Sequence, residues 1–214
     1  MAADAISFSA VVLAAGTSTR MQGRNKLLLP VGEEPVIRRT VRTVLEARPR
    51  ELVVVTGFQA AAVGQALTGL PIGLQANPRF EQGQATSVAA GVAALSQAVD
   101  ALMVCLGDLV LLTAADYREL VDAFEQIGDK SILVPYHEGH RGNPVVLARW
   151  LLPGVIAGRC DPVCRKLIAE HPEHVFTHQA AHDRFVTDMD TPADYARILG
   201  RLGVAGGLMM GHAA

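Results

Sequence analysis

The sequence predicts an α/β fold with a mainly parallel β-sheet. Three observations support this prediction. Short apolar runs of strand length alternate with longer amphipathic segments of helix length up to about residue 126. The spacing of these segments is typical of βαβ units, whose strands are parallel and whose crossovers are almost always right-handed. Half of the 214 residues are hydrophobic, which is enough to bury a sizeable core.

Strands and helices are expected to alternate in this first part of the chain. The expected strands are 9–13, 51–57, 72–77 and 101–108, and the expected helices are 35–47, 58–67, 85–95 and 113–126. Pro35 suits the first turn of its helix, and Thr113 is a suitable N-cap. Ligands of such sheets bind beyond the carboxyl ends of the strands. The turns AAGTSTR, TGFQ and GDLV are therefore expected at one rim.

The alternation loosens after residue 126. Residues 131–149 are predicted to form two strands joined by the polar turn HEGHRGN. A helix is expected over 160–172, a short strand over 174–179, and a turn leading into a last helix over 185–203. Thr191 can cap that last helix, with Pro192 at its first position. We expect one domain over residues 1–203 and a flexible glycine-rich tail over 204–214.

Composition excludes several classes of partner and site. The formal net charge is −2 and charged residues make up 19%, so neither nucleic acid nor an acidic membrane is an expected partner. No signal peptide is recognisable and no run of about 18 apolar residues predicts a membrane span, so a cytoplasmic location is expected. The odd number of cysteines argues against a disulfide scaffold. Cys160 and Cys164 are expected to be ordinary thiols rather than half of a metal site, and Cys105 a small core residue.

The first predicted strand ends in a turn rich in small and basic residues, AAGTSTRMQGRNK. This turn is not a P-loop, which ends in G-K-[ST], and it lacks the G-x-G-x-x-G dinucleotide fingerprint. Its backbone amides could cradle a phosphate while Arg20, Arg24 and Lys26 neutralise charge. A solvated surface loop is an alternative that the spacing leaves equally open.

Three aspartates are candidates for a cation site. Asp108 follows the most apolar strand, where a carboxylate is costly unless it caps a helix, pairs with a cation or binds a metal. Asp188 and Asp190 stand two positions apart on an extended segment, so both can face one side. If the three converge, they form an oxygen-ligand site suited to Mg²⁺. A turn or cap role is the alternative for each.

The polar turn HEGHRGN carries His137, His140, Arg141 and Asn143 together with two glycines. Such a set is typical of a loop that contacts an anion or a substrate. A solvated hairpin turn is the alternative, and the His-x-x-His pair alone is weak evidence for a metal.

Together these motifs resemble the small nucleotidyltransferases of the molybdenum-cofactor type. The stretch LAAGTSTRM with the following Lys26 matches the first motif of that family. The segments TG, NPRFEQGQATSVAAG, GD, RGNPV and DMDTPADY then occur in the expected order, so the resemblance covers about 11–195. The combination resembles the molybdenum cofactor cytidylyltransferase subgroup. This implies a Rossmann-like nucleotidyltransferase fold, a three-layer α/β/α arrangement with a mainly parallel sheet.

The resemblance also implies roles for individual positions. The implied nucleotide-binding set is Leu13, Ala14, Ala15, Gly16, Ser18, Arg20, Lys26, Thr56, Gly83, Ser87 and Asp108. Arg20, Lys26 and Asp108 would be catalytic, and Asp190 with Asp188 would complete a Mg²⁺ site at Asp108. Arg141 and Asn143 fall where the family places its acceptor-side loop.

The implied activity is transfer of CMP from CTP to the phosphate of a molybdopterin-type cofactor, with release of pyrophosphate. Ala15 favours cytidine, because relatives with glycine there are associated with guanine nucleotides. A molybdoenzyme or its chaperone is a further expected partner. Two alternatives stay open: a guanylyl- or other nucleotidyltransferase with a different phosphate acceptor, and a non-catalytic nucleotide-binding accessory protein.

Two positions depart from the family pattern. The turn Gly107-Asp108-Leu109-Val110 lacks the proline that usually follows the glycine-aspartate pair, which removes a fixed φ from the turn that presents Asp108. Gln22 stands where the family usually has glycine, and Gly23 follows one place later.

Overall fold

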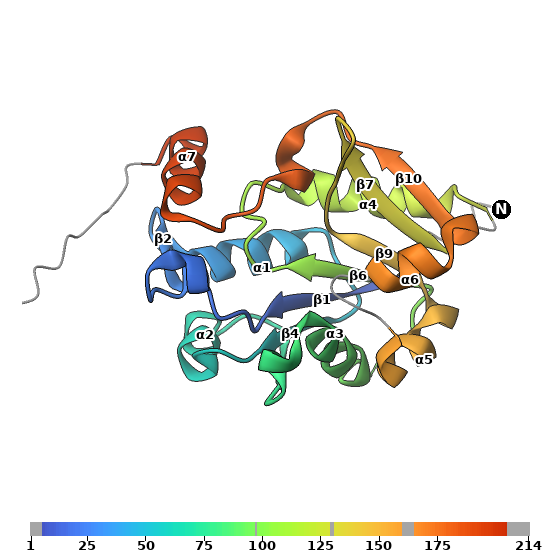
Figure 1. The fold of residues 1–214 in the computed structure, drawn as a ribbon, viewed down its shortest axis with the longest axis horizontal. Helices are drawn as coiled ribbons and strands as arrows, with labels where there is room; N and C mark the ends of the chain where they lie inside the picture. Colours follow the sequence, from blue (N-terminus) through green and yellow to red (C-terminus); the bar gives the residue numbers. More distant parts are fainter. Residues whose placement is uncertain (1–5, 97, 129–130, 160–164, 205–214) are drawn as a thin grey trace, which may run out of the picture.

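A mixed eight-stranded sheet runs through the molecule, with helices on both faces (Figure 1). The computed structural model describes residues 6–96, 98–128, 131–159 and 165–204. The strands are β1 (Phe8–Ala14), β4 (Leu52–Thr56), β5 (Gly73–Ala76), β6 (Ala101–Leu106), β7 (Ile132–His137), β8 (His140–Arg141), β9 (Val145–Ala148) and β10 (Val175–Gln179). A separate two-stranded sheet pairs β2 (Pro30–Val31) with β3 (Glu34–Pro35). Cys160, Cys164 and the predicted tail from residue 205 lie outside the described residues.

Helices fill the connections between the strands. They are α1 (Val36–Glu46), α2 (Ala60–Ala66), α3 (Gln84–Ala93), α4 (Ala114–Glu125), α5 (Leu152–Gly154), α6 (Arg165–Glu170) and α7 (Pro192–Leu202). Short 3-10 turns at η1 (Thr19–Met21), η2 (Lys26–Leu28), η3 (Phe80–Gln82) and η7 (Asp183–Val186) were not predicted. The predicted alternation of strands and helices up to residue 126 is confirmed.

The strand order is β5-β4-β1-β6-β9-β7-β10. Strands β5, β4, β1 and β6 are parallel, β9 is antiparallel to both of its neighbours, and β10 is parallel to β7. The sheet is therefore mainly parallel, as predicted. The prediction of two strands over 131–149 is corrected, because part of the polar turn folds back on β7 as the extra strand β8.

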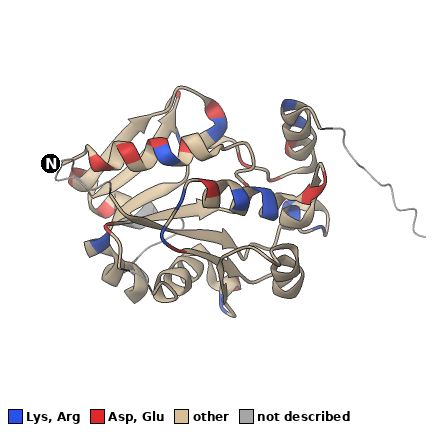
Figure 2. Ribbon diagram, turned by 180° about the vertical axis from the view of Figure 1, so that it is seen from behind, with Lys and Arg blue, Asp and Glu red and all other residues tan. Residues whose placement is uncertain are grey.

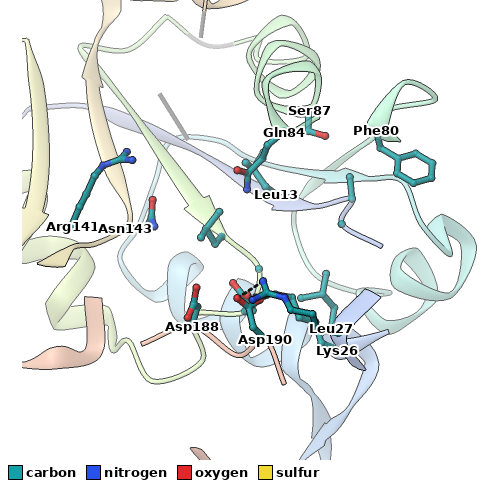
Figure 3. A pocket seen from close by; sticks show the side chains of 16 residues that line it. Leu13, Lys26, Leu27, Phe80, Gln84, Ser87, Arg141, Asn143, Asp188 and Asp190 are labelled. Carbon is teal, nitrogen blue, oxygen red and sulfur yellow. Dashed lines mark hydrogen bonds and ion pairs between the residues drawn. The ribbon is translucent and has the colours of Figure 1, made fainter. Parts of the chain in front are cut away.

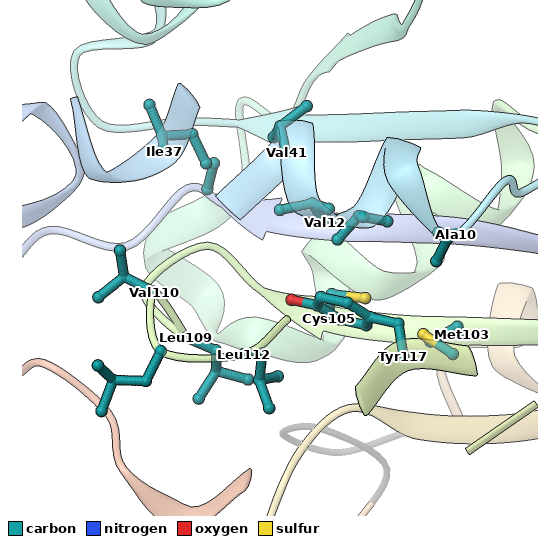
Figure 4. Packing of buried hydrophobic residues seen from close by; sticks show 14 of the residues in the cluster. Ala10, Val12, Ile37, Val41, Met103, Cys105, Leu109, Val110, Leu112 and Tyr117 are labelled. Carbon is teal, nitrogen blue, oxygen red and sulfur yellow. The ribbon is translucent and has the colours of Figure 1, made fainter. Parts of the chain in front are cut away.

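The core lies on both faces of the sheet. Along β1, Ala10 and Val12 face the layer that contains α1 and α4, whereas Val11 and Leu13 face the layer that contains α3. Successive side chains of a strand point to opposite faces, so a fully buried strand must be apolar throughout. The layer that contains α1 and α4 is called the first layer, and Figure 4 shows part of it around Ile37 and Val41. The three-layer α/β/α arrangement is confirmed.

Cys105 lies in this first layer, as predicted (Figure 4). Its side chain is fully buried, and burial raises the pKa of the thiol, because a thiolate would lose its hydration there. The group is thus a small apolar core residue rather than a nucleophile.

Two helix starts follow the predicted capping chemistry. The side chains of Thr113 and Thr191 each accept a hydrogen bond from the backbone N–H of the third residue of their helix, and the carboxylates of Asp116 and Asp194 accept one from the backbone N–H of the cap. Pro192 is in the first turn of α7, as predicted. Pro35 is instead the N-cap of α1 and part of β3, because its extended backbone pairs with Pro30 before the helix begins.

Basic and acidic residues are interspersed along the ribbon of the described residues (Figure 2). No helix within these described ranges is long and apolar enough to cross a lipid bilayer.

Two helical glycines provide a test of this packing. A methyl group on Gly91 of α3 would overlap the side chain of Val11 and lie 2.8 Å from Val55 Cγ2, whereas one on Gly200 of α7 would meet nothing within 4 Å. Gly91→Ala should lower the free energy of unfolding by about 1–3 kcal/mol, because overpacking outweighs the gain in helix propensity. Gly200→Ala should leave it unchanged or raise it by up to about 1 kcal/mol. Urea unfolding measures both, and a stabilised Gly91→Ala protein would contradict the described contact between α3 and the sheet.

Candidate functional site

A pocket of about 470 Å³ opens at the carboxyl ends of β1 and β6 (Figure 3). Many positions singled out from the sequence line it: Leu13, Ala15, Gly16, Arg20, Lys26, Ser87, Asp108, Arg141, Asn143, Asp188 and Asp190. The structure thus brings together side chains from distant parts of the chain at the sheet edge where ligands of parallel sheets bind.

Four positions carried over from the resemblance do not line this pocket. Ala14 is buried in the core layer that contains α1 and α4. The backbone carbonyl of Thr56 accepts a hydrogen bond from Asn77 N at 2.8 Å. Ser18 lies in the turn beneath Lys26, and Gly83 is the N-cap of α3 with a φ of 111°. Their positions suit them to shape the surrounding backbone.

Five lining residues were missed by the sequence analysis: Leu27, Phe80, Gln84, Leu106 and Gly107. Phe80 forms one wall of the pocket together with the turn that carries Ala15 and the turn that carries Gly57. A methyl group on Gly57 would lie 2.6 Å from Phe80 Cγ and 2.8 Å from Ala15 Cβ, so only glycine fits there. The signals in the sequence were the TG pair and the aromatic residue of NPRF.

Asn77 organises the segment that carries this wall. Its buried side chain donates hydrogen bonds to Thr86 Oγ1 at 2.8 Å and to Ser87 Oγ at 2.9 Å, and its Oδ1 accepts one from Arg79 N at 3.0 Å. One amide therefore fixes both the start of α3 and the loop before it. Such satisfied buried networks specify a single local structure.

The basic turn after β1 is tightly folded. Ser18 adopts a left-handed backbone and its Oγ accepts a hydrogen bond from Lys26 N at 3.2 Å. Asn25 is buried, and its Oδ1 accepts a hydrogen bond from Leu27 N at 3.0 Å, which caps the short helical turn that begins at Lys26. These contacts hold the base of the Lys26 side chain in place, which favours a binding turn over a solvated surface loop.

Gln22, one of the departures from the family pattern, has a φ of 53°. This left-handed region suits glycine, and a side chain there costs about 1–2 kcal/mol. Gln22 therefore holds a conformation that a glycine would adopt without this cost.

Gly107 places Asp108 at the end of β6. Its N–H donates to Leu13 O at 3.0 Å, which extends the pairing of β1 and β6. A methyl group on Gly107 would lie 2.9 Å from Ile37 Cδ1 and 3.0 Å from the same carbonyl oxygen, so the position requires glycine. Asp108 follows with 5% of its surface exposed.

The segment after Asp108 is anchored by burial instead of by proline. Residues 109–112, Leu-Val-Leu-Leu, are all buried in the first layer of the core, with 2–6% of their surface exposed. Thr113 then caps α4. Burying a leucine or valine side chain contributes about 1.5–3 kcal/mol, so this apolar run fixes the turn that presents Asp108.

Lys26 is held between two carboxylates. Its ammonium group bonds Asp108 Oδ2 and also Asp190 Oδ1 at 2.8 Å, and Arg20 Nη2 lies 2.6 Å from the other oxygen of Asp190. The side chains of Lys26, Asp108 and Asp190 are 17%, 7% and 22% exposed, whereas that of Arg20 is 67% exposed. Three segments distant in sequence therefore meet in one ion-pair network.

The carboxylates of the pocket shift the pKa of Lys26 and of Asp188. Burial disfavours the charged form of Lys26, but the carboxylates of Asp108 and Asp190 outweigh burial and raise the pKa of the ammonium group. Asp188, at the rim of the pocket, has its pKa raised by desolvation and by repulsion from Asp190 and Asp108. Three carboxylates therefore come together in the pocket, and a cation bound beside Asp188 would relieve their repulsion.

The loop that carries Arg141 and Asn143 is clamped between β7 and the segment that precedes Asp188. Gly142 N donates to Pro135 O at 2.7 Å, and Asn143 N donates to Phe185 O at 2.9 Å. A methyl group on Gly142 would lie 2.5 Å from Phe185 O, so close approach requires glycine. His137 turns away from the pocket, with Nδ1 3.0 Å from Ala180 O.

A double-mutant cycle tests the ion pair. Lys26→Met leaves buried carboxylates facing one another and should lower the free energy of unfolding by about 3 kcal/mol. Adding Asp108→Asn should restore part of that loss, with a coupling of about 1 kcal/mol or more. Arg24→Met, which removes an exposed cation from the same turn, should change stability by less than about 0.5 kcal/mol. Strictly additive losses in urea unfolding would show that Lys26 and Asp108 do not interact.

Comparison with known proteins agrees with this architecture. The family model described as the MobA-like NTP transferase domain matches residues 10–175. The chain is 24% identical over 188 residues to the molybdenum cofactor cytidylyltransferase of Escherichia coli, covering 86% of this chain and 92% of that protein. It is 32% identical over 131 residues to the bifunctional protein GlmU of a Synechococcus strain, covering 59% of this chain but only 20% of that protein.

The fold has a solved counterpart as well. A nucleotidyl transferase from Methanothermobacter thermautotrophicus superimposes with a TM-score of 0.79 at 25% identity, over 91% of this chain and 97% of the other. These similarities extend over most of the sheet described above and over most of the segments that form its pocket. The chain therefore belongs to the MobA-like NTP transferase family of nucleotidyltransferases.

Proposed function

We propose that this nucleotidyltransferase moves CMP from CTP to the phosphate of a molybdopterin-type cofactor and releases pyrophosphate. The observation that carries the proposal is the network of Lys26, Arg20, Asp108 and Asp190 at the carboxyl end of the parallel sheet. It combines cations for phosphate oxygens with carboxylates for a metal. The similarity to the Escherichia coli cytidylyltransferase over most of both chains supports this choice of substrates.

The residues present fit a divalent metal. The Lys26 ammonium bonds both Asp108 and Asp190, which shows that a single cation can reach both carboxylates at once. Asp188 lines the same pocket, so the donors are all oxygen atoms, the set that Mg²⁺ prefers. When bound there, Mg²⁺ would supply neutralisation of the charge on the triphosphate.

Catalysis by the chain itself is positioning and charge stabilisation. A phosphate oxygen of the acceptor attacks the α-phosphorus of CTP in line, the bond from that phosphorus to the bridging oxygen of the β-phosphate breaks, and pyrophosphate leaves. Lys26 and Arg20 are placed to bind the phosphate groups and to stabilise charge on the departing pyrophosphate. Arg20, which is largely exposed, can turn toward a ligand without loss of core packing.

The wall of Ala15, Gly57 and Phe80 suits the pyrimidine base. The Ala15 methyl group packs beside Gly57, and we expect a larger base to need the space that this methyl group fills. Ser87, fixed by Asn77, offers a hydroxyl group on the same side of the pocket (Figure 3).

The acceptor-side loop supports an acceptor that donates hydrogen bonds. The Oδ1 atom of Asn143 is buried and finds no hydrogen-bond partner within the described residues. A buried acceptor left unpaired costs about 1–3 kcal/mol, so a ligand N–H or O–H is expected to meet it. A different phosphate acceptor, such as a sugar phosphate, is the alternative to be tested alongside.

The two carboxylates that flank β6 allow a matched test of the metal site. Asp108 follows the strand in the pocket, and Asp100 precedes it at the opposite edge of the sheet, where it accepts hydrogen bonds from Ser7. Asp108→Asn should lower the rate of pyrophosphate release from CTP and acceptor by on the order of 10²-fold or more, because a metal ligand is lost. Asp100→Asn should leave that rate unchanged. Full activity of Asp108→Asn would refute the assignment.

Adjacent alanines allow a test of base preference. Ala15→Gly removes a methyl group from the wall and so enlarges the space for the base beside Gly57. It should reduce the preference for CTP over GTP by about tenfold, as expected for one methyl group in a fitted pocket. Ala14→Gly removes a methyl group that faces the core layer of α1 and α4. It should not change the ratio of the dissociation constants for CTP and GTP. Isothermal titration with each nucleotide measures the ratio, and an unchanged ratio in Ala15→Gly would remove Ala15 from the base pocket.

A further inference from the structure

An ion pair outside the pocket, in which the carboxylate is buried and the guanidinium is partly exposed, joins the two segments that carry the pocket carboxylates. Arg184 lies in η7, and Asp116 lies in the first turn of α4. Arg184 Nε donates to Asp116 Oδ2 at 3.0 Å, and Nη2 donates to Oδ1 at 2.6 Å. The side chain of Asp116 is 3% exposed. The pair is therefore bidentate, which fixes distance and direction as a single hydrogen bond does not.

Each end of this pair leads directly to a pocket carboxylate. Asp116 accepts a hydrogen bond from Thr113 N at 2.7 Å. Thr113 comes directly after the buried run 109–112, which itself follows Asp108. On the other side, Arg184 is followed by Phe185, whose carbonyl receives Asn143 N, and then by Asp188 and Asp190. Within the described residues the pair thus bridges the segment of Asp108 to the segment of Asp190.

We propose that the Arg184–Asp116 pair is a positioning contact that sets the spacing between Asp108 and Asp190. The proposal rests on the proposed function, since it assigns the pair to a metal site formed by those two carboxylates. Neither Arg184 nor Asp116 lines the pocket, so both act through the segments they hold. A small displacement of a reacting group is enough to reduce an enzyme's rate considerably.

A metal site at Asp116 itself is the competing interpretation. Asp116, Glu119 and His182 each offer a ligand atom, and these atoms lie within 4.8 Å of one another. The guanidinium of Arg184 already lies 2.6 Å from both Asp116 Oδ1 and His182 Nε2, and so holds the cation position of this cluster. Burial by itself would raise the pKa of Asp116, but Arg184 and Thr113 outweigh it and lower that pKa.

A second bidentate pair in the same region provides a matched control. Arg201 Nη2 and Nη1 donate to the two oxygens of Asp183 at 2.7 and 2.8 Å. Both partners belong to the C-terminal part of the chain, one in η7 and one in α7, and both are more exposed than Asp116. Breaking this pair removes the same kind of contact without loosening the bridge to the segment of Asp108.

The test compares Mn²⁺ binding by Arg184→Met and Arg201→Met proteins in the presence of CTP. The signal of free Mn²⁺ in electron paramagnetic resonance gives the affinity, and circular dichroism confirms that each variant is folded at the temperature used. Arg184→Met should weaken Mn²⁺ binding about tenfold or more, as loss of outer-shell support does at metal sites. Arg184→Lys should fall between it and the wild type, because an ammonium cannot reproduce the fork. Arg201→Met should bind as the wild type does.

The outcomes separate this inference from the function on which it rests. Wild-type protein that binds no Mn²⁺ with CTP would refute the metal site and the inference together. Wild-type protein that binds Mn²⁺ with the same affinity as Arg184→Met would refute the inference alone. If Arg184→Met does not fold, Asp116→Asn, which keeps an oxygen for the Thr113 cap, takes its place. It should weaken Mn²⁺ binding in the same direction, and unchanged affinity in it would overturn the proposal.

Discussion

The contact of the Lys26 ammonium with Asp108 and Asp190 is the interaction on which the pocket depends. It joins residues that are 82 and 164 positions apart in sequence. Both carboxylates are largely withdrawn from water, so without a cation between them their repulsion would oppose folding of the rim. The same arrangement makes the site responsive to ligands, since phosphate groups can take over the ammonium and a metal can take over the carboxylates.

The fold supplies this contact through two similar constructions. Asp108 and Asp190 each stand shortly before a helix that begins with a threonine N-cap and a capping aspartate, at Thr113 in α4 and at Thr191 in α7. In the second case the capping Asp194 also accepts from Asp190 N at 3.3 Å. Each carboxylate thereby precedes a helix start that is fixed by a reciprocal pair of cap hydrogen bonds. The parallel sheet brings the first carboxylate to the edge where β1 also ends.

The features predicted from sequence are those whose cause is local. The alternation of strands and helices follows from runs such as 101–106 and from caps such as Thr113, both visible within a short window. Asp108 was identifiable because a carboxylate at the end of an apolar strand demands a partner. Asp188 and Asp190 were grouped by their spacing, two positions apart on an extended segment, and both line the pocket.

The features that were missed depend on contacts between distant segments. The place of β9 between β6 and β7, and the fold-back of β8, follow from pairing that a local pattern does not specify. Phe80 gains its position from packing against Gly57, and the apolar run 109–112 gains its role from the core beneath it. That burial, rather than a proline with its fixed φ, holds the turn that presents Asp108.

The most direct test of the central claim is pyrophosphate release by the wild-type protein, measured with CTP, GTP, ATP and UTP, with Mg²⁺ and a molybdopterin-type acceptor, beside sugar-phosphate acceptors. The pocket described here predicts release with CTP and the molybdopterin-type acceptor that stops when Mg²⁺ is removed. Tight binding of CTP without pyrophosphate release for any acceptor would contradict it.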